Sequence, residues 1–194
     1  MSFLEIAQTN ALNSSRRGFL GKTGILLSAS AVALLAGREG LAAEQKAGGS
    51  AANDVAILNS ALGSELEAIA AYQVGAGSGL LTPGSKAVAL QFQGHHKAHA
   101  DLLAATVSKL GGHAVQAKSH YDFPVASLKN EADVLRFAAK LESGAVSAYL
   151  GAVPVFDNRD LSRAAASILG DEAMHLAILR QVLGDNPVPA AFVG

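Results

Sequence analysis

The chain has 194 residues, of which half are apolar and only 16% charged, and its formal net charge is −1. This length allows one ordinary domain, and the near-neutral charge without a basic stripe argues against nucleic acid as a partner. The chain has no cysteine, which excludes disulfides, thiolate nucleophiles and thiolate metal ligands. Any bound metal must therefore be held by carboxylates and imidazoles, which suit iron, manganese or zinc.

An export signal is predicted at the N-terminus. Residues 14–22 read SSRRGFLGK, and the arginine pair Arg16–Arg17 is followed by an apolar run over residues 23–37. That run is too short to cross a bilayer comfortably but has the length of a signal-peptide core. Small residues near positions 40–43 offer a site for a signal peptidase. This order of features resembles a twin-arginine signal, which implies export of a folded protein by the twin-arginine machinery.

We therefore expect residues 1–43 to form the signal and residues 44–52 to form a flexible leader. The expected location is the periplasm or another extracytoplasmic space. A short N-terminal membrane anchor or an amphipathic helix is the alternative for the same segment. The sequence leaves open whether the signal is cleaved.

Four helices are predicted in residues 53–184. Asn53 or Asp54 is the expected cap of the first helix, and Gly184 ends the fourth. The predicted helices cover about residues 53–76, 85–111, 131–153 and 160–183. Two short connections flank a long one at residues 113–129, which is the loop pattern of an all-α, antiparallel four-helix bundle with a crossover between helices 2 and 3. We expect the tail, residues 185–194, to be extended and pinned to the bundle by Phe192.

The two halves of this region repeat one arrangement of acids, tyrosines and imidazoles. The repeated set comprises Glu65, Tyr72, His96 and His99 in the first half and Glu142, Tyr149, Glu172 and His175 in the second. Glu65 precedes Tyr72 by seven residues and His99 by 34 residues. Glu142 likewise precedes Tyr149 by seven residues and His175 by 33 residues. We interpret this as an internal duplication.

Every member of the repeat lies on the apolar stripe of its predicted helix. Glu65, for example, shares a face with Leu62 and Ile69, because positions three or four apart lie side by side on a helix. A buried ionised carboxylate costs several kcal/mol unless it is paired or bound to metal, and no lysine or arginine lies on these stripes. The pattern predicts metal bound by Glu65, His96, His99, Glu142, Glu172 and His175. The alternative is that these groups bond one another, with some glutamates neutral and the tyrosines donating.

The segments ALGSELEAIAAY, HHKAH, LESGAVSAYLGAVP and DEAMH resemble the ferritin-like superfamily, most closely its exported, desiccation-related branch. The resemblance covers about residues 53–184. It implies a ferritin-like bundle with a centre of two iron ions, in which two helices supply one glutamate each and two supply a Glu-x-x-His pair. The single acids are then Glu65 and Glu142, and Glu172 with His175 is one complete pair. Asp171 is expected to orient a ligating imidazole from outside the ligand set.

The second pair departs from the family pattern, because His96 stands where a glutamate is expected. His95, four residues before His99, is a competing ligand. The loss of a bridging carboxylate makes a single ion, or manganese or zinc, more plausible than in a complete site. Tyr72 and Tyr149 are expected to pack beside the ligands, where they could also tune them or relay charge.

The leading hypothesis is thus an exported metal-binding protein with a carboxylate and histidine site for two iron (or manganese) ions and with oxygen or peroxide chemistry. A non-catalytic stress-associated or desiccation-associated bundle with a structural or vestigial metal site is the alternative, and iron storage ranks third. The chain has no phosphate-binding loop and no nucleophile motif, which places a metal-independent enzyme last. Weakly charged, alanine-rich helix faces suggest a homodimer.

Overall fold

The structure is a computed structural model that describes residues 50–193. The predicted signal and most of the predicted leader lie outside the described residues. The helices are α3 (Ser50–Gly77), α4 (Pro83–Lys109), α5 (Glu131–Ala152) and α6 (Arg159–Leu183), with short 3-10 turns η2 (Val125–Ser127) and η3 (Val153–Val155). No strand occurs among the described residues, so the predicted all-α class is confirmed.

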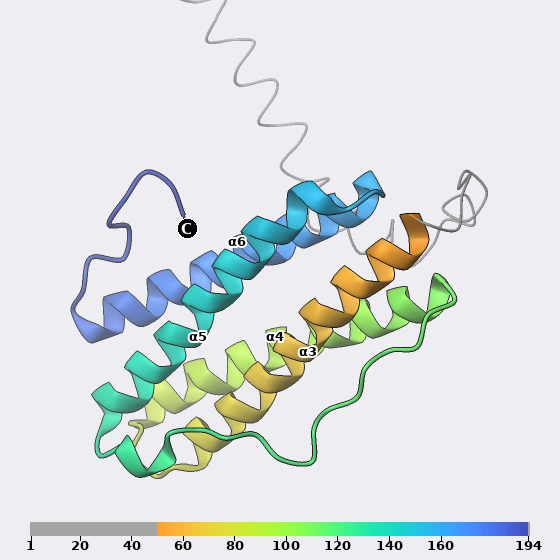
Figure 1. Cartoon of the computed structure of the whole chain (residues 1–194). Helices are drawn as coiled ribbons and strands as arrows, with labels where there is room; N and C mark the ends of the chain where they lie inside the picture. The colour runs from red at the N-terminus through yellow and green to blue at the C-terminus, as the bar shows by residue number, and fades with distance from the viewer. Residues whose placement is uncertain (1–49, 194) are drawn as a thin grey trace, which may run out of the picture.

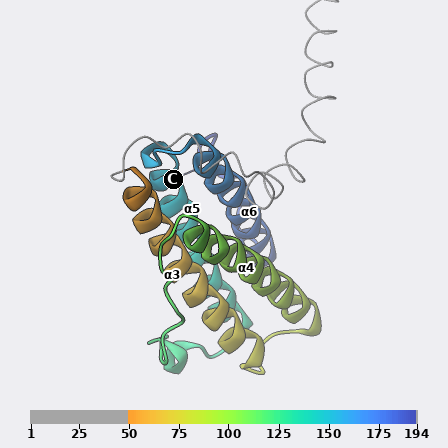
Figure 2. The same ribbon diagram turned by 90° about the vertical axis from the view of Figure 1, so that its right-hand side faces the viewer.

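The four helices form an antiparallel bundle with one long connection (Figures 1 and 2). Helix α3 packs against α4, α5 packs against α6, and contacts between α3 and α5 join the two pairs. The connection between α4 and α5 runs back along the length of the bundle, so α5 starts beside the end of α3 (Figure 1). Helices α3 and α5 are therefore antiparallel, and the predicted crossover bundle is confirmed.

The predicted end signals of α5 and α6 are present. The side chain of Asn130 accepts a hydrogen bond from the backbone N–H of Asp133 at 3.0 Å and so caps α5. Gly184 ends α6 with a φ of 80°, a backbone conformation that glycine adopts without steric cost. Helix α4 starts at Pro83, slightly earlier than predicted. The side chain of Thr82 accepts a hydrogen bond from the backbone N–H of Ser85 and so caps the helix, and a proline is tolerated in the first turn.

The predicted start of the first helix is wrong, because α3 begins at Ser50 and contains both Asn53 and Asp54. Asp54 is fully buried, and its side chain forms hydrogen bonds at the start of α6 instead of capping α3. Its carboxylate accepts the backbone N–H groups of Asp157 at 2.8 Å and Asn158 at 3.1 Å. Asp54 thus fixes the start of α3 to the link between α5 and α6.

The apolar core is divided into two clusters by a polar layer, which consists of the predicted acids and imidazoles on the four helices. One cluster includes Leu62 of α3 and Ile168 of α6, and the other includes Phe92 of α4 and Leu179 of α6. On every helix the predicted acids and imidazoles lie between residues of the first cluster and residues of the second. The layer is therefore enclosed at both ends by apolar packing.

The prediction that Phe192 pins the tail is wrong, because its side chain is 89% exposed. The tail is not extended as predicted, because bends at residues 185, 187–188 and 190–192 interrupt it, and it lies beside Met174, which is itself exposed. Within the described residues, none of the helices combines the length and the apolar character that a bilayer crossing requires.

Candidate metal centre

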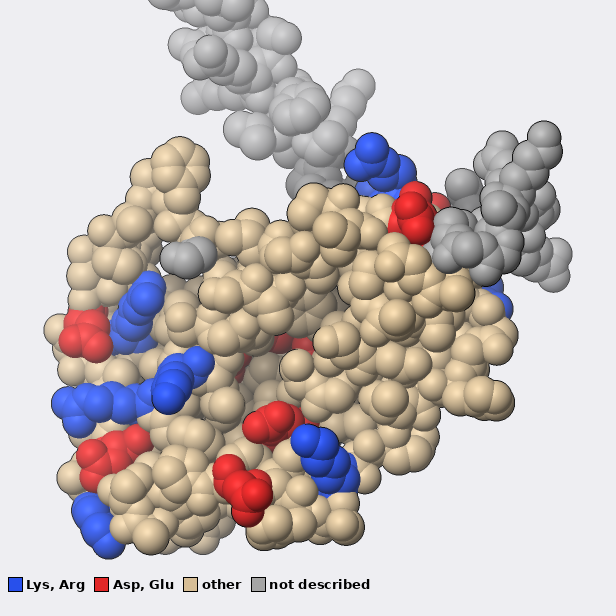
Figure 3. All heavy atoms as spheres, in the orientation of Figure 1, with Lys and Arg blue, Asp and Glu red and all other residues tan. Residues whose placement is uncertain are grey.

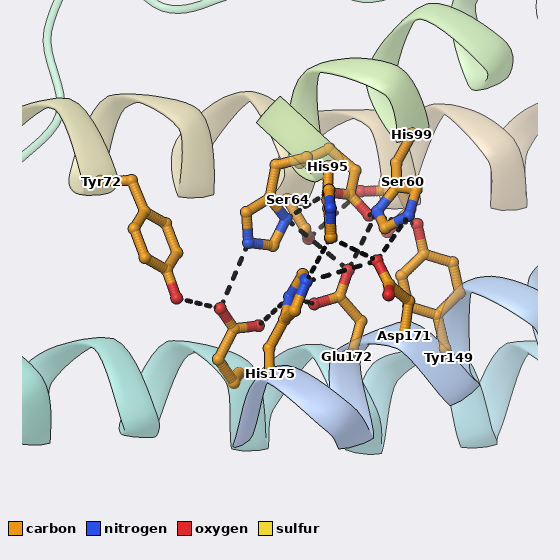
Figure 4. A network of polar contacts seen from close by, with 12 residues as sticks. Ser60, Ser64, Tyr72, His95, His99, Tyr149, Asp171, Glu172 and His175 are labelled. Carbon is orange, nitrogen blue, oxygen red and sulfur yellow. Dashed lines mark hydrogen bonds and ion pairs between the residues drawn. The ribbon is translucent and has the colours of Figure 1, made fainter. Parts of the chain in front are cut away.

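The polar layer brings all six predicted ligand residues together from the four helices (Figure 4). Five of the six side chains are buried, and only His99 retains a small exposure. They are Glu65 of α3, His96 and His99 of α4, Glu142 of α5, and Glu172 and His175 of α6. The faces assigned to these residues from the sequence are therefore the faces they occupy.

His96 lies at the centre of the layer and contacts carboxylates from three helices. Its Nδ1 is 2.8 Å from Oε2 of Glu65 and 3.6 Å from Oε1 of Glu172, and its Nε2 is 3.3 Å from Oε1 of Glu142. One nitrogen thus faces the Glu65 side of the layer and the other faces the Glu142 side.

The other two imidazoles each direct one nitrogen inward and one outward. The inward Nδ1 of His175 lies 3.2 Å from Oε2 of Glu172, and the inward Nδ1 of His99 lies 3.1 Å from Oε1 of Glu172. The outward Nε2 of each ring lies 3.3 Å from Oδ2 of Asp171. Asp171 is therefore placed to orient both imidazoles, one more than the sequence led us to expect.

The two tyrosines cross over between the repeated halves. The hydroxyl of Tyr149 donates to Oε1 of Glu65 at 2.6 Å, and the hydroxyl of Tyr72 donates to Oε1 of Glu142. Because α3 and α5 are antiparallel, a tyrosine two turns after its own glutamate lies level with the glutamate of the other helix. Burial and the adjacent carboxylate raise the pKa of both tyrosines above the ordinary value, so both remain donors.

The carboxylates and imidazoles shift one another's pKa toward the charged forms. Burial alone lowers the pKa of His96, but hydrogen bonds to Glu142 and Glu65 outweigh it and raise that pKa to about 10. Burial alone raises the pKa of Glu65, but the same kind of contact with His96 and His99 lowers it to about 2. The pKa of Glu172 is raised, mainly by burial. Without metal, the centre thus balances its carboxylates with protons on the imidazoles.

The residues fit a bound metal ion. Among the described residues, four buried side-chain polar atoms make no hydrogen bond of good geometry, and three of them are Nδ1 of His99, Oε2 of Glu142 and Oε1 of Glu172. The first and last of these lie 3.1 Å apart, as an ion pair. Two overlapping groups of residues in the layer each bring their donor atoms within 4.8 Å of one another. One group is Glu65, His96, His99 and Glu172, and the other is His96, Glu142, Glu172 and His175. Mixed carboxylate and imidazole donors suit iron, manganese and zinc.

The centre is reached from the surface through a cleft between α3 and α5. The cleft has a volume of about 700 Å³, its walls are mostly small apolar residues such as Ala61 and Ala145, and Glu65, His96 and Glu142 lie at its base. Figure 3 shows this face hollowed near its middle, with acidic side chains visible in the depth. A small reactant can therefore approach the Glu65–Glu142 side of the centre.

His95, which the sequence offered as a competing ligand, lies on the outer side of the buried ligands and contacts one of them, His175. Its side chain is 39% exposed, and its Nδ1 lies 2.8 Å from Nε2 of His175 and 3.2 Å from Oδ2 of Asp171. The adjacent His96 is buried instead, because neighbouring positions on a helix point about 100° apart. Sequence reasoning did not anticipate this outer group of imidazoles around Asp171.

Comparisons with known proteins agree with the fold. The ferritin-like domain family matches residues 53–185. Among solved structures, a conserved hypothetical protein, rv2844, from Mycobacterium tuberculosis is 27% identical, with a TM-score of 0.63 over 73% of this chain and 97% of that chain. No curated protein matches the chain.

Proposed function

Because the chain belongs to the ferritin-like domain family, we propose that it is an exported metal-binding protein whose buried centre binds iron, with manganese or zinc as the other candidates. The observation that carries this proposal is the convergence of six ligand-type side chains in a layer where three buried nitrogen and oxygen atoms make no hydrogen bond of good geometry. A metal ion gives those atoms a partner. Export is supported by the arginine pair Arg16–Arg17 and the apolar run that follows it.

The chain's residues have distinct parts in this function. The six ligands hold the ion, Asp171 orients His99 and His175, and the tyrosines orient Glu65 and Glu142. A bound iron or manganese ion supplies redox chemistry toward oxygen or peroxide. The apolar clusters exclude bulk water from both ends of the layer, and the cleft admits a small reactant.

We propose that His96 limits the centre to one firmly held ion. A neutral imidazole offers a lone pair on only one nitrogen, whereas a carboxylate offers two oxygens that can serve two ions. His96 belongs to both donor groups, so an ion that takes it from one group leaves the other group a ligand short. A glutamate at this position would have no such restriction.

A second candidate function is supported by the hydrogen bonds within the layer. The imidazoles, carboxylates and tyrosines bond one another, and the imidazoles carry balancing protons in the metal-free form. Such a centre can stabilise the bundle without metal. This candidate is a non-catalytic helical protein associated with stress or desiccation, with a structural or vestigial metal site.

Elemental analysis separates the two functions. The protein is purified from its native compartment without chelator, and about one iron or manganese per chain is expected. Glu142→Ala and His175→Ala should lose the metal, because each removes a buried donor. Glu67→Gln, on the same helix as Glu65 but at the cleft, is the matched control and should retain it. Wild-type protein that stays empty after anaerobic reloading would support the non-catalytic candidate.

A further inference from the structure

A second group of metal-type donors lies on the outer side of the buried centre, between α4 and α6. It consists of His95 of α4, Asp171 of α6 and the outward Nε2 nitrogens of His99 and His175 (Figure 4). The cleft opens between α3 and α5, so the two approaches to the centre use different pairs of helices.

The spacing of three of these donor atoms, those of His95, Asp171 and His175, matches that of ligands around one divalent ion. Nδ1 of His95 lies 3.2 Å from Oδ2 of Asp171 and 2.8 Å from Nε2 of His175, and Nε2 of His175 lies 3.3 Å from Oδ2 of Asp171. Two ligand atoms that each lie about 2.1 Å from one metal ion, with an angle near 100° at the ion, are about 3.2 Å apart. The donors therefore require little rearrangement to take an ion.

The group extends from solvent to the centre. The side chains of His95 and Asp171 are 39% and 24% exposed, whereas that of His175 is 2% exposed. The rings of His99 and His175 have one nitrogen beside this outer group and the other beside Glu172. A hydrated cation can therefore exchange its waters for protein donors one at a time on this side.

The cleft offers a cation less favourable contacts. Most of its walls are apolar, and Lys140 and Glu67 both belong to its lining. A hydrated divalent ion crossing apolar walls loses water without gaining ligands, which is costly. The cleft therefore suits a neutral reactant better than a metal ion.

We propose that His95 and Asp171, with the outward nitrogens of His99 and His175, form an outer site that captures a divalent transition-metal ion from solvent and passes it to the buried centre. This inference rests on the proposed function, because the transfer requires a centre that binds metal. Metal and reactant then reach the centre by separate routes.

The test is the rate at which metal-free protein takes up Co²⁺, followed by the visible absorbance of the bound ion in a stopped-flow instrument. His95→Ala should load at least about tenfold more slowly than wild type, a loss typical for ligands outside a metal's immediate set, and should reach the same final absorbance. His120→Ala is the matched control, because it removes an imidazole from an exposed His–Asp pair with a separation of 3.0 Å, and it should load at the wild-type rate.

A variant that narrows the other route completes the test. Ala145→Phe places a bulky ring on the cleft wall and should leave the loading rate unchanged. Wild-type loading rates in His95→Ala, or slowed loading in Ala145→Phe alone, would overturn the outer site and leave the proposed function intact. Wild-type protein that takes up no Co²⁺ would overturn the proposed function, and this inference with it. The melting temperature of each variant verifies that it is folded.

Discussion

At the scale of single residues, His96 is the position at which the centre departs from the ligand pattern that the resemblance implies. Its two nitrogens lie 2.8 Å from Oε2 of Glu65 and 3.3 Å from Oε1 of Glu142, so a carboxylate at this position would face both single glutamates. His96→Glu is therefore expected to raise the metal content from about one to about two ions per chain, measured by elemental analysis. His96→Gln, which removes the imidazole without adding a carboxylate, should not gain an ion. An unchanged content in His96→Glu would show that another residue limits the number of ions.

The crossed tyrosines give a second prediction at this scale. Tyr149→Phe removes the hydrogen bond to Oε1 of Glu65 and leaves a buried charged group with one donor fewer. We expect the metal-free protein to lose about 2 kcal/mol of unfolding free energy, measured by denaturant unfolding in the presence of chelator. Tyr121→Phe, whose hydroxyl lies in the exposed crossover, should change it by less than about 0.5 kcal/mol. Equal effects of the two substitutions would contradict a specific role for the crossed pair.

At the scale of the helices, Asp54 joins two elements that are about 100 residues apart in the sequence. Asp54→Ala removes the acceptor of two backbone N–H groups at the start of α6, so the unfolding free energy should fall by about 2 kcal/mol or more. Asp54→Asn keeps one carbonyl oxygen and should lose less. Asp101→Ala, an exposed aspartate on α4, serves as the control and should be nearly neutral.

The helices and the shared buried position of the six candidate ligands were predictable from sequence because both depend on local periodicity. The spacing of Glu65 and Tyr72, and its repetition at Glu142 and Tyr149, was enough to place these side chains on one buried face. The role of Asp54 was not predictable, because it looks like a local helix cap, whereas its partners lie in another part of the chain. The outer group around Asp171 was also missed, because it depends on how α4 and α6 approach one another. Phe192 shows the limit of hydrophobicity alone, since an aromatic residue needs a vacant crevice to become buried.

At the scale of the whole molecule, the proposed export route can be tested separately from the metal. Replacing Arg16 and Arg17 with lysine should cause the protein to accumulate inside the cytoplasm, because the arginine pair is the feature that resembles a twin-arginine signal. The measurement is the fraction of protein in each compartment by immunoblot. Replacing Lys22 with arginine, which keeps the charge, should leave export unchanged. Continued export of the double lysine variant would contradict this route.

The stability of the metal-free protein should depend on pH in a defined direction. Contacts with carboxylates raise the pKa of His96 to about 10 and the pKa of His99 and His175 to about 9, against 6.5 in the unfolded chain. These contacts therefore stabilise the fold fully below pH 6.5, and the stabilisation is lost as the pH rises through 9 to 10. Glu65, with a pKa lowered from 4.5 to about 2, loses its contribution only in acid.

We therefore expect the melting temperature in chelator to fall by more than about 5 °C between pH 6.5 and pH 10, measured by calorimetry. Metal-loaded protein should not show this fall, because the ion replaces the imidazole protons, and its affinity should rise with pH over the same range. His96→Gln provides the control, since it lacks the imidazole with the highest pKa and should show a smaller fall in chelator. A metal-free protein that is equally stable at pH 6.5 and pH 10 would mean that protonated imidazoles do not balance the buried carboxylates, and the charge of the layer would then have to be neutralised on the glutamates themselves.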